Sequence, residues 1–251
     1  MDGELTREER ERLAFMLAEQ KKRHDQRKFF RMFPDEDTEQ LDGSIIHARE
    51  KYQRHLEFFA KGTTYRERCF MAANRVGKTV SGSFETTCHL TGLYPHWWEG
   101  RTFDHPIRAW AAGKTNETSR DIVQTELLGA VQSAAKGRNK GFTGTGMIPG
   151  QRIGSVTWKQ GVQDFADTVK IKHASGGWST LGMKSFQQGR GSFEGTAQHL
   201  IWLDEECPIE VYGECLIRTA TTKGVIILTF TPLEGLTETV LQFMPQEMRP
   251  E

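Results

Sequence analysis

The residues best suited to chemistry stand at the end of the segment Met71–Thr79, which reads MAANRVGKT. A short apolar run precedes the segment and a helix-like stretch follows it. In such a strand–turn–helix context, backbone N–H groups surround phosphate oxygens. Lys78 would neutralise charge on the β- and γ-phosphates, and the Thr79 hydroxyl would bind Mg²⁺. The segment departs from G-x-x-x-x-G-K-[ST] only at its first position, where Ala72 replaces glycine.

Two adjacent acids, Asp204 and Glu205, follow the apolar run Leu200–Leu203 much farther along the chain. Such a run predicts a buried parallel strand, and ligands of open α/β sheets bind at the carboxyl ends of these strands. We therefore expect Asp204 to reach the Mg²⁺ held by Thr79, and Glu205 to activate or orient an attacking water. The competing interpretation, solvated acids that merely end a strand, is weakened by the phosphate-binding loop upstream.

Two hydroxyl residues, Thr229 and Thr231, end the next apolar run, Val225–Phe230. At the tip of the strand beside the acid strand, such hydroxyls can sense the γ-phosphate and relay the change to the substrate side. A plain turn before Pro232 is the alternative interpretation, and the residues alone leave both open.

The elements that must position these residues alternate between strand-like and helix-like patterns. This alternation predicts an α/β protein with a mostly parallel central sheet flanked by helices. Residues 136–155 are Gly-rich and predict a long loop. Strands are expected at 68–73, 107–112, 168–173, 180–186, 200–204 and 225–230, and helices at 4–32, 47–60, 115–131 and after the loop.

Length and composition fit a cytosolic α/β protein. The 251 residues, 37% of them hydrophobic, can bury one sizeable core. No apolar run approaches membrane length, and the charged N-terminus has no signal-peptide pattern. Four cysteines without a C-x-x-C pair argue against a zinc site and for a reducing compartment. The glycines of Gly189–Gly195 have the wrong spacing for a dinucleotide fingerprint and precede a strand.

The net charge is zero, but the charges are unevenly distributed. Residues 101–200 carry 13 Lys/Arg and 7 Asp/Glu, whereas residues 201–251 carry 3 and 9. The basic part includes the loop Lys136–Gly141 and the alternating strand Lys170–His173. Such segments can follow a nucleic-acid backbone without reading bases, or can simply be solvated, and both interpretations stay open.

Three motifs together resemble those of the large terminase subunit of tailed bacteriophages: Ala72–Thr79, Leu200–Glu205 and Thr229–Pro232. The segments His89–Pro95 and Lys184–Arg190 also resemble the corresponding segments of that family. The resemblance covers about residues 45–240. The resemblance implies a P-loop NTPase of the additional-strand, conserved-glutamate type that uses ATP and Mg²⁺. It also implies a homo-oligomeric ring that docks on the portal protein, works with the small terminase subunit and drives double-stranded DNA into the procapsid. The resemblance further implies that no membrane is involved and that the location is the host cytoplasm.

The resemblance also implies roles for individual residues. Glu205 would be the catalytic carboxylate, Thr79 and Asp204 would hold Mg²⁺, and Arg75 would contact the γ-phosphate or switch residues. Gln53 would contact adenine, because a Gln amide both donates and accepts, although a surface Gln is an equal alternative. The remaining expected nucleotide-contacting residues are Ala73, Asn74, Arg75, Val76, Gly77, Lys78, Thr79, Thr229 and Thr231.

A ring motor also needs an arginine from the neighbouring subunit, which accelerates hydrolysis by about 10³–10⁵-fold. Some relatives carry it in an Arg-Gly step before the acid strand, where this chain has Glu194-Gly195. Arg190 is the substitute that we expect, and Arg120 and Arg218 remain candidates.

The expected organisation is an N-terminal helical segment at 1–45, a P-loop ATPase core at 46–238, and the start of a linker at 239–251. About twenty residues follow Pro232, too few for a nuclease domain, so no nuclease activity is expected. A P-loop kinase would not need Glu205. The alternatives are a helicase-like nucleic-acid translocase ATPase and a non-hydrolysing nucleotide-binding docking module.

Overall fold

A computed structural model describes residue 6 and residues 12–16, 27–40, 43–134 and 139–249. The chain divides into two compact units, Met1–Lys51 and Tyr52–Glu251. The division falls a few residues beyond the boundary expected after residue 45. Within the described part of the chain, no helix has both the length and the apolar character needed to cross a membrane.

In the first unit, the helix expected at 4–32 is interrupted. Residues 12–16 and α2 (Lys28–Arg31) are helical, but Arg27 between them is extended, with φ −77° and ψ 141°. Residues 4, 5, 7–11 and 17–26 of the expected helix lie outside the described residues. Farther on, β1 (Thr38–Glu39) pairs antiparallel with β2 (Ile45–Ile46).

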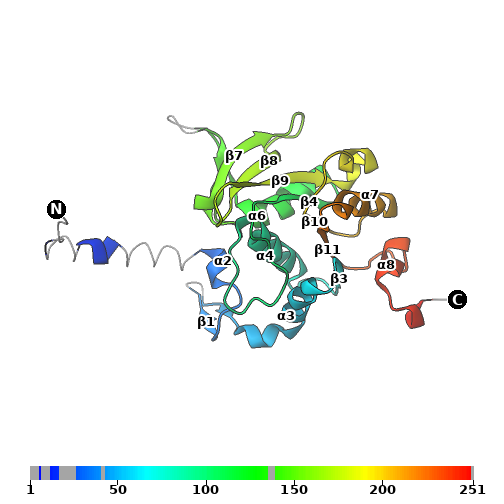
Figure 1. The fold of residues 1–251 in the computed structure, drawn as a ribbon, viewed down its shortest axis with the longest axis horizontal. Helices are drawn as coiled ribbons and strands as arrows, with labels where there is room; N and C mark the ends of the chain where they lie inside the picture. Colours follow the sequence, from blue (N-terminus) through cyan, green and yellow to red (C-terminus); the bar gives the residue numbers. More distant parts are fainter. Residues whose placement is uncertain (1–5, 7–11, 17–26, 41–42, 135–138, 250–251) are drawn as a thin grey trace. The chain divides into compact units, whose positions relative to one another are not determined.

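The second unit contains a seven-stranded sheet in the order β3-β11-β10-β4-β9-β8-β7 (Figure 1). The first five strands in this order run parallel to one another, whereas β8 is antiparallel to both β9 and β7. The strand β11 lies between the strand before the loop and the acid strand, which is the additional-strand arrangement that we expected. The strands are β3 (Glu67–Met71), β4 (Arg108–Gly113), β7 (Ile153–Trp158), β8 (Ala166–Lys172), β9 (Trp178–Ser185), β10 (Leu200–Asp204) and β11 (Val225–Phe230).

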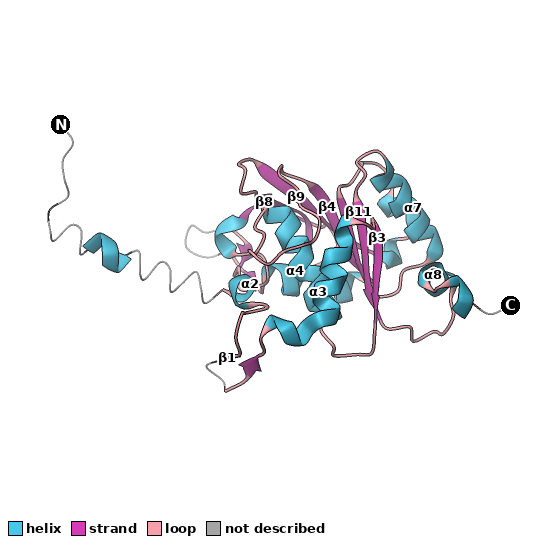
Figure 2. Ribbon diagram, turned by 60° about the horizontal axis from the view of Figure 1, so that its bottom comes forward, coloured by secondary structure: helices cyan, strands magenta, loops and turns pink. Residues whose placement is uncertain are grey.

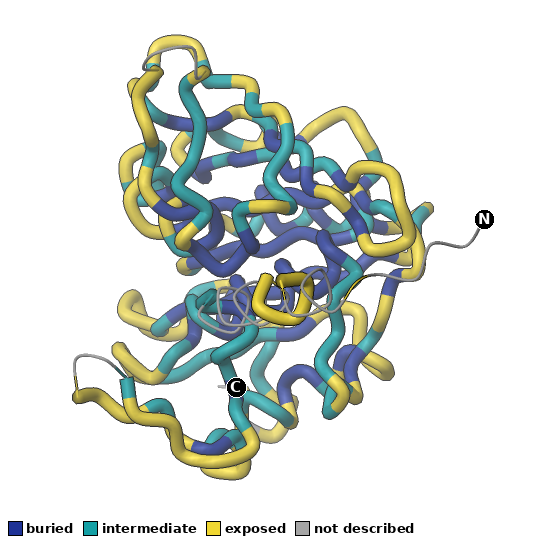
Figure 3. Tube along the Cα trace, turned by 90° about the vertical axis from the view of Figure 1, so that its left-hand side faces the viewer, coloured by how far each residue is buried: buried dark blue, intermediate teal, exposed yellow. Residues whose placement is uncertain are grey.

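Helices cover both faces of the sheet, so the prediction of a mostly parallel sheet flanked by helices is confirmed. The helices α4 (Lys78–Thr91) and α7 (Ile209–Ala220) lie on opposite sides of the central strands (Figure 2). Every residue of β10 and β11 is buried, and Figure 3 shows this buried interior in dark blue. Because successive side chains of a strand point to opposite faces, both faces of a covered strand must be apolar.

Several elements differ in detail from the expectation. The loop expected at 136–155 ends in β7, because Ile153–Trp158 pairs with β8 although its side chains are half-exposed. The helix capped by Thr115 ends at Leu128 instead of about Val131, and Ser119–Gln124 within it is π-helical. The remaining elements are α3 (Gln53–Ala60), α5 (Asn116–Thr118), α6 (Thr125–Leu128), α8 (Glu238–Phe243), and the pair β5 (Val131–Gln132) and β6 (Gly141–Phe142).

The helix α8 falls in the range that the sequence assigns to the start of a linker. Its residues Thr239 and Val240 are buried, and Val240 belongs to the apolar cluster formed by α7 and the sheet. The chain therefore stays packed on the second unit at least as far as this helix.

Candidate active site

The predicted phosphate-binding loop connects the end of β3 to the first residue of α4. Gly77 and Arg75 both have left-handed backbones, with φ 84° and 64°. Glycine adopts this conformation freely, whereas at Arg75 it stores strain of about 1–3 kcal/mol. A Cβ atom at Gly77 would also lie only 3.1 Å from Nε2 of His55, so a side chain there would be strained by its backbone and would displace the His55 imidazole slightly.

The start of α4 is arranged to receive an anion. The first N–H groups of any α-helix lack intrahelical partners, and among the described residues no side chain caps those of this fourteen-residue helix. Lys78 is 9% exposed, and its ammonium donates to the Ala73 carbonyl oxygen at 2.6 Å. A phosphate oxygen would be a stronger partner for this ammonium than the neutral carbonyl.

The structure brings Thr79 and Asp204 together, as the sequence predicts. The Thr79 hydroxyl lies 3.1 and 3.2 Å from the two carboxylate oxygens of Asp204, which is 3% exposed. Burial raises the pKa of Asp204 to about 7, although hydrogen bonds from Thr229 and Thr79 oppose the rise. Within the described ranges, no cluster of three His, Cys, Asp or Glu side chains could hold a metal. A hydroxyl and a carboxylate instead fit Mg²⁺, which is typically bound by few protein oxygens together with water and phosphates.

The hydroxyls at the end of β11 connect the acid to the loop. Thr229 donates to Asp204 Oδ1 at 2.6 Å, and the Thr231 hydroxyl lies 3.0 Å from the Ala72 carbonyl and 2.8 Å from Asn74 Oδ1. These contacts follow from the register, in which Thr229 is opposite Asp204 and Phe230 is opposite Met71.

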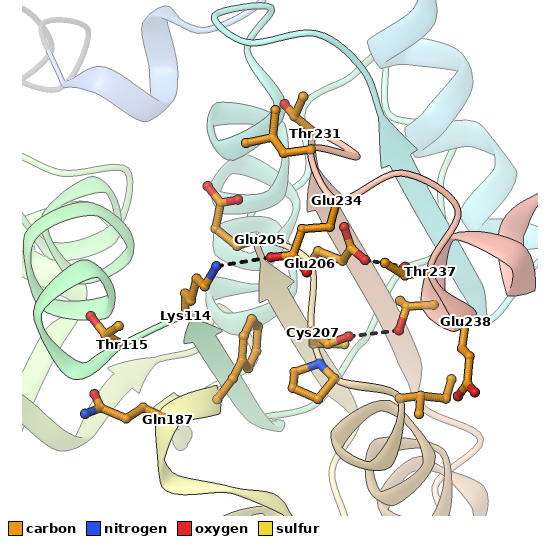
Figure 4. A pocket seen from close by; sticks show the side chains of 15 residues that line it. Lys114, Thr115, Gln187, Glu205, Glu206, Cys207, Thr231, Glu234, Thr237 and Glu238 are labelled. Atoms are coloured by element: carbon orange, nitrogen blue, oxygen red, sulfur yellow. Dashed lines mark hydrogen bonds and ion pairs between the residues drawn. The ribbon is translucent and has the colours of Figure 1, made fainter.

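The Glu205 backbone turns sharply after the acid strand. Its φ is 89°, and its N–H donates to the Thr229 carbonyl at 3.0 Å. A non-glycine residue with positive φ is uncommon and costs about 1–3 kcal/mol. Its side chain lines a pocket of about 610 Å³ at the tips of β4, β10 and β11, together with Lys114, Glu206 and Thr231 (Figure 4). The Glu205 carboxylate therefore faces an open space, whereas that of Asp204 is buried.

The structure places the remaining predicted residues in different surroundings. Gln53 is exposed on the first turn of α3. Arg190 donates to the buried carboxylate of Glu214 at 3.0 Å, and Arg218 lies 2.9 Å from the same side chain. Arg120 pairs with its neighbour, Asp121. All three candidate arginines thus have partners within their own chain.

The basic loop is described only in part. Lys136 and Arg138 lie outside the described residues. Lys140 pairs with Asp164 at 2.7 Å and lies 4.1 Å from the centre of the Trp158 ring. In the alternating strand, Lys170 donates to the Thr180 hydroxyl at 2.8 Å.

The structure shows two groups of contacts near the loop that the sequence does not predict. The His55 imidazole donates to the Val76 carbonyl at 3.0 Å and packs edge-on against Phe70, so α3 is attached to the loop. Farther along α4, the buried carboxylate of Glu85 accepts hydrogen bonds from Arg68 and His89. Glu85 and His89 have the i, i+4 spacing that indicates a helical pair, but nothing in the local sequence indicates that Arg68 joins them.

The match to a protein family covers most of the chain. The family described as "Terminase large subunit, T4likevirus-type, N-terminal" matches residues 69–251. The large terminase subunit of Salmonella phage P22 is 34% identical over 229 residues, which cover 84% of this chain and 44% of that protein. The chain thus spans less than half the length of this relative.

Solved structures of phage terminases are also similar. The ATPase domain of the Thermus phage P74-26 large terminase has a TM-score of 0.48 at 13% identity, over 76% of this chain and 71% of that one. The large terminase of another thermophilic bacteriophage, in complex with ADP, has a TM-score of 0.45 at 16% identity, over 72% and 38%. Because the family match runs from β3 to the last residue and includes the loop, the acid strand and β11, this chain belongs to the N-terminal family of T4-like large terminase subunits.

Proposed function

We propose that this chain binds ATP with Mg²⁺ and hydrolyses it, and that hydrolysis drives double-stranded DNA into a viral procapsid. The observation that carries the proposal is the contact between Thr79 and Asp204, which joins the phosphate-binding loop to the acid strand. Glu205, which lines an adjacent pocket, adds a carboxylate for the attacking water. Membership of the terminase family supplies the link from ATP to DNA.

In this proposal, each residue of the loop and the acid strand has a separate task. The N–H groups at the start of α4 and the Lys78 ammonium bind the phosphates, and Thr79 and Asp204 hold Mg²⁺. A Mg²⁺ ion held by these two residues would supply positive charge to neutralise the phosphate oxygens. Glu205 orients the attacking water and accepts its proton.

The remaining assignments concern neighbouring residues and subunits. Arg75 and Asn74 contact the γ-phosphate side of the loop, and Gln53 contacts adenine. Arg190 acts on the site of the next subunit of a homo-oligomeric ring, for which it would have to leave Glu214. The partners are the portal protein and the small terminase subunit, and the location is the host cytoplasm.

ATP turnover as a function of protein concentration tests the proposal, with Glu205→Gln as the loss-of-function variant. Glu206→Gln is the matched control, because Glu206 is adjacent but hydrogen-bonds to Thr237. Turnover that rises steeply with concentration, disappears in Glu205→Gln and persists in Glu206→Gln would support a ring ATPase completed between subunits. Tight ATP binding without turnover at any concentration would instead favour the non-hydrolysing docking module.

A further inference from the structure

Trp202 is a fully buried tryptophan two residues before Asp204 on β10. Because side chains alternate along a strand, Trp202 and Asp204 point to the same face of the sheet, the one covered by α4. The indole Nε1 lies 2.8 Å from the Thr229 hydroxyl oxygen, and that oxygen lies 2.6 Å from Asp204 Oδ1. A continuous chain of side-chain hydrogen bonds thus ends on the acid.

The direction of this chain is fixed by the chemistry of its members. An indole N–H can only donate, so the Thr229 oxygen must accept from Trp202. The single hydroxyl proton of Thr229 then points away from the indole, and Asp204 Oδ1 is positioned to receive it. Trp202 therefore determines which way the Thr229 hydroxyl points, and Thr229 in turn holds one oxygen of Asp204.

The helix α4 accommodates the indole through a glycine. A Cβ atom at Gly82 would lie 2.2 Å from Nε1 and 2.4 Å from Cε2 of Trp202, closer than any real contact. Glycine within a helix costs about 0.5–1 kcal/mol relative to alanine, so the close approach is maintained against helix propensity. The helix α4, which begins at the phosphate-binding loop, therefore packs directly against Trp202.

We propose that Trp202 is a positioning residue that, through Thr229, holds the Asp204 carboxylate ready for Mg²⁺; this inference rests on the proposed nucleotide site. Without the indole N–H, the Thr229 hydroxyl can turn to other acceptors and Asp204 loses a fixed donor. Net hydrogen-bond contributions of ordinary size predict that Mg²⁺ affinity weakens by about threefold to tenfold.

The test measures binding of a fluorescent ADP analogue while Mg²⁺ is titrated, and again in EDTA. Trp202→Phe keeps an aromatic ring and removes the N–H. Trp110→Phe makes the same change in the neighbouring strand β4, where Trp110 packs in the cluster on the α7 side. In Trp202→Phe, we expect that about threefold to tenfold more Mg²⁺ is needed to support nucleotide binding. We expect no change in Trp110→Phe, and unchanged nucleotide affinity in EDTA for both variants.

A second pair of variants keeps the test decisive if Trp202→Phe folds poorly. Thr229→Val removes the hydroxyl at nearly constant shape and should weaken the apparent Mg²⁺ affinity. Thr229→Ser keeps the hydroxyl and should bind Mg²⁺ almost as tightly as wild type. The double variant Trp202→Phe/Thr229→Val should have about the same Mg²⁺ affinity as either single variant, because both changes break the same chain of hydrogen bonds. Unchanged Mg²⁺ dependence in Trp202→Phe, or in Thr229→Val, would overturn the inference while the proposed function stands. A wild-type protein whose nucleotide binding ignores Mg²⁺ would overturn both.

Discussion

Glu85 should be among the residues whose substitution destabilises the protein most. It lies on α4, completely buried, and its ion-pair partner Arg68 on β3 has a side chain only 4% exposed. The Arg68 guanidinium also donates to the Phe58 carbonyl and lies 4.9 Å from the centre of the Phe58 ring. The pair thus joins the strand before the phosphate-binding loop to the helix after it, and ties both to α3.

The size of the effect follows from the hydrogen bonds at the Glu85 carboxylate. Arg68 donates to both oxygens, and the His89 imidazole donates to one of them. Burial raises the pKa of Glu85, but the Arg68 charge and these hydrogen bonds outweigh it, so the pKa lies below its ordinary value. Glu85→Gln would turn an amide NH₂ toward one of these donors and leave the guanidinium without a counter-charge. Removing one partner of a buried pair costs about 3–5 kcal/mol of unfolding free energy.

Urea and thermal unfolding of wild type and Glu85→Gln test this prediction. A loss of 3–5 kcal/mol corresponds to about 6–20 °C in melting temperature for a chain of this size. Glu57→Gln, which makes the same change in the exposed pair with Arg54, is the control and should stay within about 1 kcal/mol of wild type. Replacing both partners, as Arg68→Met with Glu85→Leu, should cost less than Glu85→Gln alone. A Glu85→Gln protein as stable as the control would refute the argument that Arg68 depends on this carboxylate.

Four further predictions follow from the same contacts. Gly82→Ala should destabilise the protein by about 1–3 kcal/mol in urea unfolding, because the new methyl group would collide with the Trp202 indole despite better helix propensity. Gly77→Ala should reduce nucleotide affinity at least tenfold in the fluorescent-ADP assay, because the Gly77 backbone is left-handed and an added Cβ atom would lie close to His55. Unchanged affinity would contradict this prediction. Asp204→Asn should abolish the Mg²⁺ dependence of nucleotide binding, and calorimetry that finds it intact would place the metal elsewhere. The contribution of His89 to stability should fall as the pH drops below about 6.5, because burial lowers the pKa of His89 and the unfolded chain therefore takes up this proton first. This contribution is present above the pKa of His89 in the unfolded chain and is lost as the pH falls toward the pKa in the folded chain, by up to about 1.4 kcal/mol per pH unit. The free energy of unfolding should therefore decline less between pH 7 and pH 5 in His89→Gln than in wild type.

The structural features near the site that the sequence predicts correctly are those with a local pattern. Four apolar residues before Asp204 indicate a buried parallel strand, and the structure has that strand at Leu200–Asp204. Gly77 is recognisable because the turn between a strand and a helix in this motif needs a left-handed backbone, and Gly77 has φ 84°. Local patterns also predict the Thr115 cap, where the hydroxyl accepts from the Thr118 N–H.

The parts that the sequence does not reveal depend on contacts between distant segments. Arg68 appears as a charged residue at the start of a strand, and only the packing of α3 and α4 around β3 makes it a buried ion. Gly82 and Trp202 are each unremarkable in sequence, yet they are matched in space. The strand β7 has half-exposed side chains and an edge position, so its pattern is too weak to distinguish from a loop.

The central position of β11 explains how one strand can serve both halves of the site. It pairs with β10 on one side and β3 on the other, so its hydroxyls reach different neighbours. Thr229 contacts the acid on β10, whereas Thr231 contacts Ala72 and Asn74 in the loop after β3. A displacement of β11 relative to either neighbour would break one of these sets of hydrogen bonds while leaving the other. We therefore propose that β11 is the element that passes the state of the phosphate site to the rest of the sheet.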